Sequence, residues 1–386
     1  MSETAGRARL VPMRARDPHE PGRVASSLEL FFDLVFVVAV SVAAARLHHA
    51  LSDQHTFDGL TSYAIVFFGI WWAWMNFTWF ATSFATDDWL YRLITIVQMS
   101  GVLVLAAGID AVYTDHDFTV VTLGYVVMRI AMVTQWLRAA RAGGTSRPAA
   151  LFYAGGIATV QVLWLLNLLV PGSIQPFTVI LCVLAELAVP VIAERRGGTP
   201  WHPHHITERY GLFTLILLGE GLLASANAII EAVHEHDELG PLIALSVLTL
   251  VVTAALWWIY FWPPHHTVIG SFASSLRYGY VHYFVFAAAG AFSAGIEVEI
   301  DVITHHSKLS EVAASYTVTV PIAIFVLGIW WIALRANADR VVNVVVPLGA
   351  GLVLLDPLIP VPFALTAVFM ALVVATLVLR PPVAAS

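Results

Sequence analysis

The sequence predicts an all-α membrane protein, a polytopic helical bundle of about 12 transmembrane helices. Hydrophobic residues make up 59% of its 386 residues and charged residues only 12%, whereas soluble domains are about 45 to 50% apolar. Runs of about 20 apolar residues, each long enough to cross a hydrocarbon core of roughly 30 Å, recur from Leu28 to Leu379. Because unpaired backbone groups are too costly in lipid, we expect each run to be a helix.

The predicted spans follow one another with short interruptions. They begin near Ser27, Leu60, Leu90, Phe118, Ala149, Ile174, Tyr210, Pro241, Tyr278, Val312, Val341 and Pro357. The last two are less regular, because the segment Asp356-Pro357-Leu358-Ile359-Pro360 separates them. Residues 341–355 are short enough to be a re-entrant segment instead of a full span.

The placement of basic residues predicts the orientation. With the N-terminus inside, sixteen of the nineteen fall on the cytoplasmic side, Arg46 and Lys308 fall outside, and Arg129 lies within the fourth span. We therefore expect a multi-pass protein of the cytoplasmic (inner) membrane with both termini in the cytoplasm. No basic patch argues for nucleic-acid binding, and the single cysteine, Cys182, predicts neither a disulfide framework nor a zinc site.

A constant offset of 187 residues relates the two halves of the chain. It aligns Asp33 with Glu220, Trp71 with Trp258, and Asp110 with Glu297. We predict two parallel six-helix pseudo-repeats, residues 27–196 and 197–386, after a cytoplasmic N-terminal tail of residues 1–26. Repeats of this kind place a binding site at the interface between halves.

Intramembrane acids are the first functional candidates, since a charge at mid-bilayer costs at least about 2.5 kcal/mol unless it is paired or hydrated. Glu29 and Asp33 are four residues apart and share one face of the first helix. Glu220 lies between Gly219 and Gly221, which would let another helix or a hydrated path approach the carboxylate. The acids thus predict a proton-sensitive site. As an alternative, they accept hydrogen bonds from neighbouring helices and only stabilise the bundle.

Arg129 requires an acidic partner, because a guanidinium stays charged within the membrane. Asp33, Glu186 and Glu220 are the candidates. Such a pair could be a structural salt bridge, or it could gate or tune the acids.

Other polar and aromatic residues are secondary candidates. Glu208 and Arg209 are expected to form a structural ion pair near the start of the seventh span. Trp71 and Trp258 suit an interfacial aromatic belt or, alternatively, the surface between the halves. No metal site or other cofactor is predicted, and loop positions in solvent explain the clustered histidines better than metal ligation does: His202, His204, His205, His265 and His266.

Two stretches resemble a known family. Leu28-Glu29-Leu30-Phe31-Phe32-Asp33-Leu34-Val35-Phe36-Val37, and Glu208-Arg209-Tyr210-Gly211-Leu212-Phe213 through Leu218-Gly219-Glu220, look like the bacterial low temperature requirement protein A family. The resemblance covers nearly the whole chain and implies a multi-helix membrane protein.

A remoter similarity is to the endolysosomal potassium and proton channel family, whose six-span repeats carry Arg-x-x-x-Phe-Ser-Asp in the first helix. Phe31-Phe32-Asp33 stands in that place, with Phe32 for the serine and Ser27 for the arginine. These departures argue against carrying over potassium selectivity.

The leading functional hypothesis is a channel or transporter that moves a proton or small cation along intramembrane carboxylates. Asp33 and Glu220 would face the path, Glu29 would tune Asp33, and Arg129 would neutralise or gate the pair. Membrane lipids are the other expected partners, and a homo-oligomer is compatible with the sequence. The second hypothesis is an intramembrane enzyme acting on a lipid or isoprenoid substrate, although an enzyme is less favoured than a transport protein. The third and weaker one is a membrane sensor that transports nothing.

Overall fold

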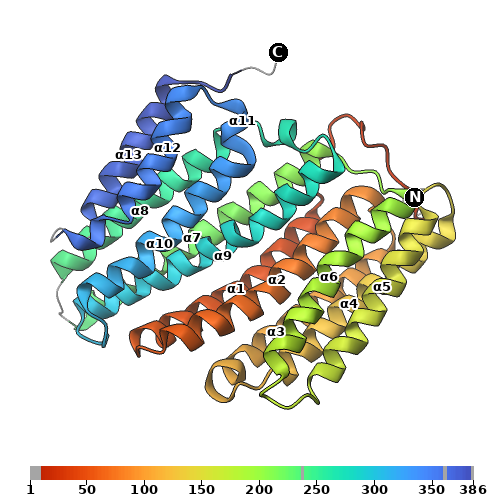
Figure 1. Ribbon diagram of the computed structural model, residues 1–386, viewed down its shortest axis with the longest axis horizontal. Helices are drawn as coiled ribbons and strands as arrows, with labels where there is room; N and C mark the ends of the chain where they lie inside the picture. Colours follow the sequence, from red (N-terminus) through yellow and green to blue (C-terminus); the bar gives the residue numbers. More distant parts are fainter. Residues whose placement is uncertain (1–9, 236–238, 360–362, 384–386) are drawn as a thin grey trace, which may run out of the picture. The chain divides into compact units, whose positions relative to one another are not determined.

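The computed structural model describes residues 10–235, 239–359 and 363–383, and all regular structure within these residues is helical (Figure 1). Ten candidate spans among them are long and apolar enough to cross a membrane. Nine are single helices: α1 (Ser27–Ser52), α2 (Thr56–Phe84), α3 (Trp89–Asp115), α4 (Thr119–Ala142), α5 (Arg147–Asn167), α6 (Gln175–Gly197), α7 (Pro203–Glu235), α8 (Leu239–Phe261) and α9 (Phe272–Ile303). The tenth joins α10 (Glu311–Ile329), a π-helical turn η2 (Trp330–Leu334) and α11 (Arg335–Asn337). The predicted polytopic bundle is confirmed.

The last two apolar helices are shorter than the others. α12 (Arg340–Val353) and α13 (Ala364–Leu379) have 14 and 16 residues, or about 21 and 24 Å at 1.5 Å per residue, against a core of roughly 30 Å. The predicted start of the last helix near Pro357 is wrong, because Asp356–Leu358 forms a 3-10 turn, η3, and α13 begins at Ala364. The buried Asp356 carboxylate accepts hydrogen bonds from the Thr366 backbone N–H and hydroxyl, which fixes the first turn of α13. Pro360, named in the predicted boundary, lies outside the described residues.

The chain forms two compact units. The first unit contains residues 1–39 and 72–206, and the second contains residues 40–71 and 207–386. The first half of α1 and the second half of α2 belong to the first unit, and their other halves belong to the second unit. The two units are defined by contacts between residues, and they do not test whether the two halves of the sequence are equivalent. The six-helix repeats therefore stay a prediction.

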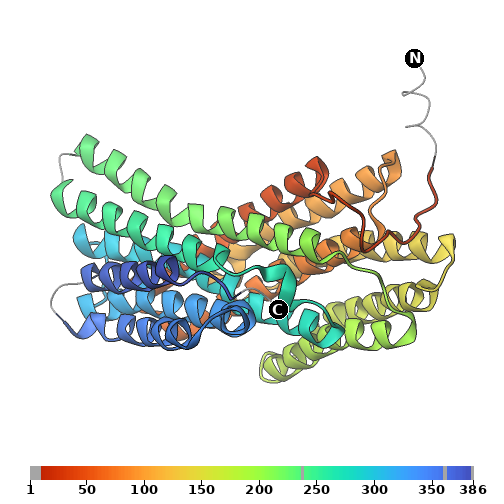
Figure 2. The same cartoon turned by 90° about the horizontal axis from the view of Figure 1, so that it is seen from above.

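In the first unit, α3, α4, α5 and α6 pack as successive neighbours (Figures 1 and 2). The described part of the predicted N-terminal tail is docked on this unit. The Val11 backbone N–H donates to Asp88 at 3.1 Å, the Arg16 N–H donates to the Ser83 carbonyl at 2.8 Å, and Met13 is buried. Arg7 and Arg9, which contributed to the predicted orientation, lie outside the described residues.

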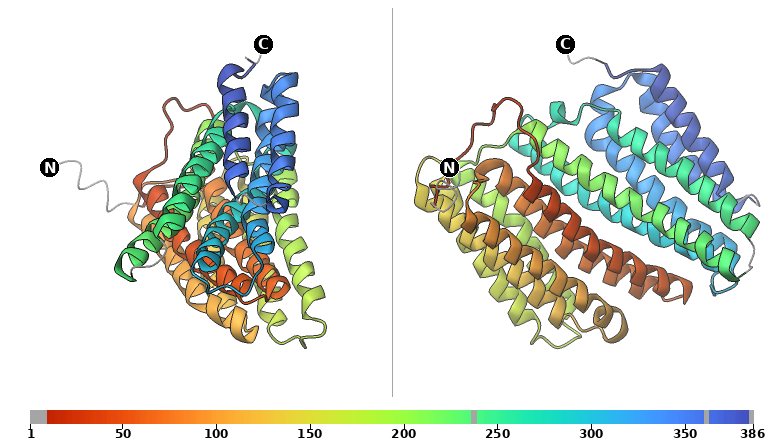
Figure 3. Two further views of the ribbon diagram at one scale, coloured as in Figure 1. Left: turned by 90° about the vertical axis from the view of Figure 1, so that its left-hand side faces the viewer. Right: turned by 180° about the vertical axis from the view of Figure 1, so that it is seen from behind.

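In the second unit, α10 packs against α8, α9 and α12, while α13 packs against α8 and α12 (Figure 3). Close packing here depends on small residues. A Cβ on Gly295 of α9 would collide with the Thr317 carbonyl of α10. Gly108, which the 187-residue offset aligns with Gly295, plays the same part in the first unit, where a Cβ would lie 2.7 Å from the Val121 backbone nitrogen of α4.

Candidate functional site along helix α1

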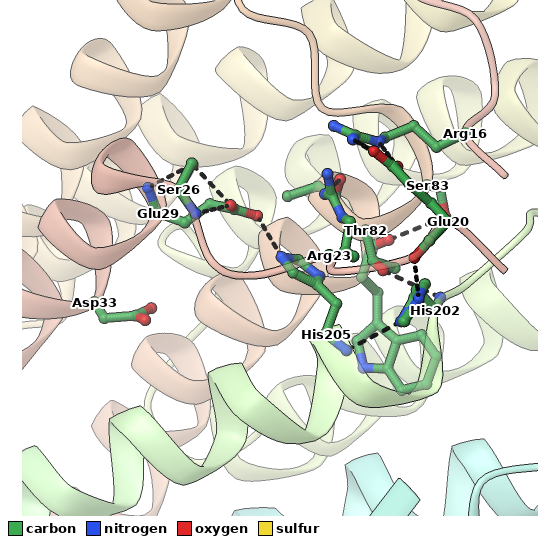
Figure 4. Close-up of polar contacts among 12 residues, drawn as sticks. Arg16, Glu20, Arg23, Ser26, Glu29, Asp33, Thr82, Ser83, His202 and His205 are labelled. Atoms are coloured by element: carbon green, nitrogen blue, oxygen red, sulfur yellow. Dashed lines mark hydrogen bonds and ion pairs between the residues drawn. The ribbon is translucent and has the colours of Figure 1, made fainter. Parts of the chain in front are cut away.

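Glu29 forms one half of a capping box at the start of α1. The Ser26 hydroxyl accepts from the Glu29 backbone N–H at 3.3 Å, and the Glu29 carboxylate accepts from the Ser26 backbone N–H at 2.8 Å. The carboxylate is 1% exposed and also lies 3.2 Å from His205 Nε2 (Figure 4). Glu29 therefore has a structural task at the helix terminus. Its influence on Asp33 stays a prediction.

Asp33 lies one turn further along α1, where it is fully buried in the first unit. The indole N–H of Trp74 in α2 donates to Asp33 Oδ1 at 2.7 Å. Because an indole can only donate, this contact is compatible with either an ionised or a protonated carboxyl group. Asp33 is thus a fully buried carboxyl group that receives a hydrogen bond from a second helix.

Glu220 of α7 lies beside α1 in the second unit, where the Ser41 hydroxyl donates to its carboxylate at 2.7 Å. The two flanking glycines have different surroundings. A Cβ on Gly221 would touch the Phe292 ring of α9 at 3.3 Å, whereas one on Gly219 would meet open space. The half-buried carboxylate thus lies beside both a close helix contact and an open position.

His48 marks the far end of the same helix. Its Nδ1 lies 2.8 Å from Glu297 Oε2 and its Nε2 lies 2.7 Å from Asp301 Oδ2, both on α9. The Ser52 hydroxyl donates to the same Asp301 oxygen at 2.7 Å. His48 thus lies between two carboxylates, and imidazole and carboxylate are both groups that can bind protons.

These side chains share one side of α1. Glu29, Asp33, Ser41, His48 and Ser52 follow one another at intervals of four, eight, seven and four residues. At 3.6 residues per turn, these intervals place all five within a sector of about 140°. We call these five residues the polar stripe. Its candidate functional residues are Glu29 and Asp33 in the first unit. In the second unit they are Ser41 with Glu220, and His48 with Glu297 and Asp301.

The partner of Arg129 is Glu186 of α6, at 2.9 Å. Four donors reach the Glu186 carboxylate, from Arg129 and Tyr125 of α4, Trp72 of α2 and Gln161 of α5. They match the hydrogen-bonding capacity of a carboxylate anion and join four helices in the first unit. Arg129 Nε and Nη1 are buried and have no hydrogen-bond partner among the described residues.

The secondary candidates have varied surroundings. Asp110 is exposed on α3, in contrast to Glu297, its predicted repeat equivalent. Trp71 is 1% exposed and packs edge-on against Tyr283, whereas Trp258 is 40% exposed. Their places in an aromatic belt or between the halves stay predictions. Arg209 is buried and Glu208 half-buried, and their pairing stays a prediction.

The expected position in solvent is wrong for His202, His205 and His265, because neighbouring side chains bury all three. His202 Nε2 lies 3.0 Å from the Glu20 carbonyl, and His205 contacts Glu29. His204 is exposed and His266 is half-buried. Within the ranges that the structure describes, no group of three or more His, Cys, Asp or Glu side chains is arranged to hold a metal ion.

The sequence reasoning missed a buried ring of hydrogen bonds in the second unit. His265 Nε2 donates to the Tyr260 carbonyl at 2.6 Å, while His265 Nδ1 accepts from the Tyr278 hydroxyl at 3.1 Å. His282 Nδ1 donates to the Tyr278 carbonyl at 2.7 Å and its Nε2 accepts from the Tyr260 hydroxyl at 3.1 Å. We assign these tautomers because carbonyl oxygens only accept. Burial lowers the pKa of His265, which lies between α8 and α9, to about 4.

The fold and the polar stripe define a multi-pass helical membrane protein with buried carboxylates in its spans. A family model described as bacterial low temperature requirement A protein (LtrA) matches residues 24–379, so the chain belongs to that family, as its motifs predicted. An uncharacterised protein from Rhizobium meliloti (strain 1021) is 27% identical over 247 residues, which cover 61% of this chain and 58% of that relative. The chain thus matches less than two thirds of that relative's length.

Proposed function

We propose that this protein is a channel or transporter of the cytoplasmic membrane, with both termini inside, that moves protons or a small cation along the polar stripe of α1. The observation that carries the proposal is the series of protonatable groups from Glu29 to His48 on one side of a single spanning helix. A helix that only packs against its neighbours has no need of such a series, because each buried acid is costly in a membrane.

The spacing along α1 suits a proton path that includes water. At 1.5 Å per residue, Glu29 and Asp33 are about 6 Å apart along the axis, Asp33 and Ser41 about 12 Å, and Ser41 and His48 about 10 Å. Direct transfer does not cover these steps. Glu220, held by the Ser41 hydroxyl, supplies a carboxylate in the longest stretch.

A cavity of about 380 Å³ at the start of α1 supports access of protons or cations to one end of the polar stripe. Ser26, Ser27 and Glu29 belong to its lining, so it reaches the first acid of the polar stripe.

Glu186 has no place in the proposed path. Its oxygens already accept from four side chains, including the Arg129 guanidinium. Protonation would break at least one of these contacts, so the pair is better suited to holding helices together than to carrying protons. For Arg129 we therefore propose the structural salt bridge, which is one of the two roles that the sequence left open.

Flux through the purified chain in liposomes tests the proposal. Vesicles carry a potassium gradient and an internal pH dye, and the native chain is compared with Asp33→Asn and Glu220→Gln. Each variant is expected to lose at least 80% of the native rate while keeping its helical circular dichroism. Asp110→Asn, which neutralises an exposed acid on α3, is the matched control and keeps the native rate.

Native flux in both carboxylate variants would contradict the proposed path. Absence of flux in well-folded native protein would contradict transport. Lipid turnover in that sample would then favour the intramembrane enzyme, and its absence would favour the sensor.

A further inference from the structure

The cavity near the start of α1 has an unusual lining of arginines. Three line it: Arg16 from the N-terminal segment, Arg23 just before α1, and Arg92 in the first turn of α3. Two acids, Glu29 and Asp87, belong to the same wall. Figure 4 shows Arg23 between the Ser26–Glu29 box and the Arg16–Glu20 pair. The proposed transport function makes no use of these arginines.

These arginines have guanidinium N–H groups that their contacts within the protein do not use. Arg16 and Arg92 each hold one acid through Nε and Nη2, and these contacts do not use Nη1. Arg23 donates Nη2 to the Ala81 carbonyl at 3.2 Å, and its buried Nε has no hydrogen-bond partner among the described residues. A guanidinium with unused N–H groups suits the oxygens of a phosphate, which it can bind in a bidentate manner.

The first turn of α1 also favours binding of an anion in this cavity. Ser27 and Leu28, which occupy the first turn of the helix, also line the cavity. Backbone N–H groups in a first turn lack partners within the helix, and the helix dipole favours an anion there. Phe31 is 50% exposed and also lines the cavity, so its wall continues into the apolar surface of a spanning helix.

We propose that this cavity binds a phosphate group, with the headgroup of an anionic phospholipid and free phosphate as the two sources that the chemistry allows. The guanidinium groups and the first turn of α1 contact the phosphate oxygens. Phe31 contacts the acyl chains when the ligand is a lipid. Asp87 on the lining holds Arg92 in place, and Glu20 outside the lining holds Arg16.

Binding to the full-length chain in detergent tests this inference. The probes are dioctanoyl phosphatidylglycerol, dioctanoyl phosphatidylcholine and inorganic phosphate, and the readout is ligand retention in native mass spectrometry together with the shift in unfolding temperature. Arg92→Gln changes a half-exposed side chain and leaves the helix contacts in place. Arg23→Gln removes the central donor. Arg141→Gln, at an exposed position near the end of α4, is the matched control.

Phosphatidylglycerol is expected to bind at least tenfold more weakly to Arg92→Gln and Arg23→Gln than to the native chain and to Arg141→Gln. Retention of inorganic phosphate with the same dependence on arginine would assign a phosphate site that is open to both sources. Retention of phosphatidylglycerol alone would assign a lipid site. Equal retention of phosphatidylcholine, or equal binding in all the arginine variants, would overturn the inference.

Discussion

At the scale of single residues, the surroundings of a buried acid decide what it can do. The Asp33 carboxylate accepts from the Trp74 indole, and the Glu186 carboxylate accepts from four side chains, one of them a guanidinium. Both acids are fully buried, and the sequence alone presents each as an isolated carboxylate in an apolar run. Partners such as Trp74 and Tyr125 lie on other helices, so the composition of a span could not show which side chains surround its acid.

Glu186→Gln is predicted to destabilise the protein by about 3 to 5 kcal/mol, because it leaves the buried Arg129 charge without a counter-ion. Unfolding temperature in detergent measures the effect. The double variant Arg129→Met/Glu186→Met removes both charges and should recover most of the loss. A single variant as stable as the native chain would contradict the structural role.

His265 makes stability depend on pH. Its pKa is lowered by burial to about 4, below the value near 6.5 of an exposed histidine, so the unfolded chain binds the proton first as the pH falls. The folded state therefore loses stability from about pH 6.5 down to about pH 4, by about 3 kcal/mol in total from this group. Unfolding temperatures measured across that range should show the loss, and His265→Gln should flatten the curve. An identical slope in the variant would contradict this assignment.

At the scale of elements, α1 combines a hydrogen-bonded N-terminal cap with the polar stripe that we propose as the transport path. The pattern Ser26-x-x-Glu29 is a capping-box signal that could be read from the sequence, and the structure forms it. The period of the polar stripe could also be read, since its spacing follows the helical turn. Its partners could not, because Glu297 and Asp301 lie about 250 residues from His48 and no local pattern joins them.

Ser26→Ala is predicted to weaken the first turn of α1 by about 1 kcal/mol, because it removes the hydroxyl that caps the helix. Hydrogen exchange at residues 27–30 should become roughly fivefold faster, since exchange by local opening follows the free energy of that opening. Ser26→Thr keeps the hydroxyl and serves as the control. Unchanged exchange in Ser26→Ala would show that other contacts of Glu29 hold the turn.

At the scale of the whole molecule, apolar run lengths were enough to predict the class of fold and the start of most spans. They failed at the last helix, where a 3-10 turn and a capping aspartate delay the start to Ala364. The candidate acids were also identifiable, since charged residues stand out in apolar runs. Tyr260, Tyr278 and His282 did not stand out, because tyrosine and histidine are common near membrane interfaces and their ring depends on tertiary packing.

The most direct test of the central claim is whether both ends of the polar stripe belong to one path. Proton flux in liposomes is measured for Asp33→Asn, His48→Asn and the variant that carries both changes. A path in series predicts that each single change lowers the rate at least fivefold and that the loss in the double variant falls well short of the product of the two single losses, because resistances in series add. Native flux in His48→Asn, with Asp33→Asn impaired, would contradict a path along the full length of α1.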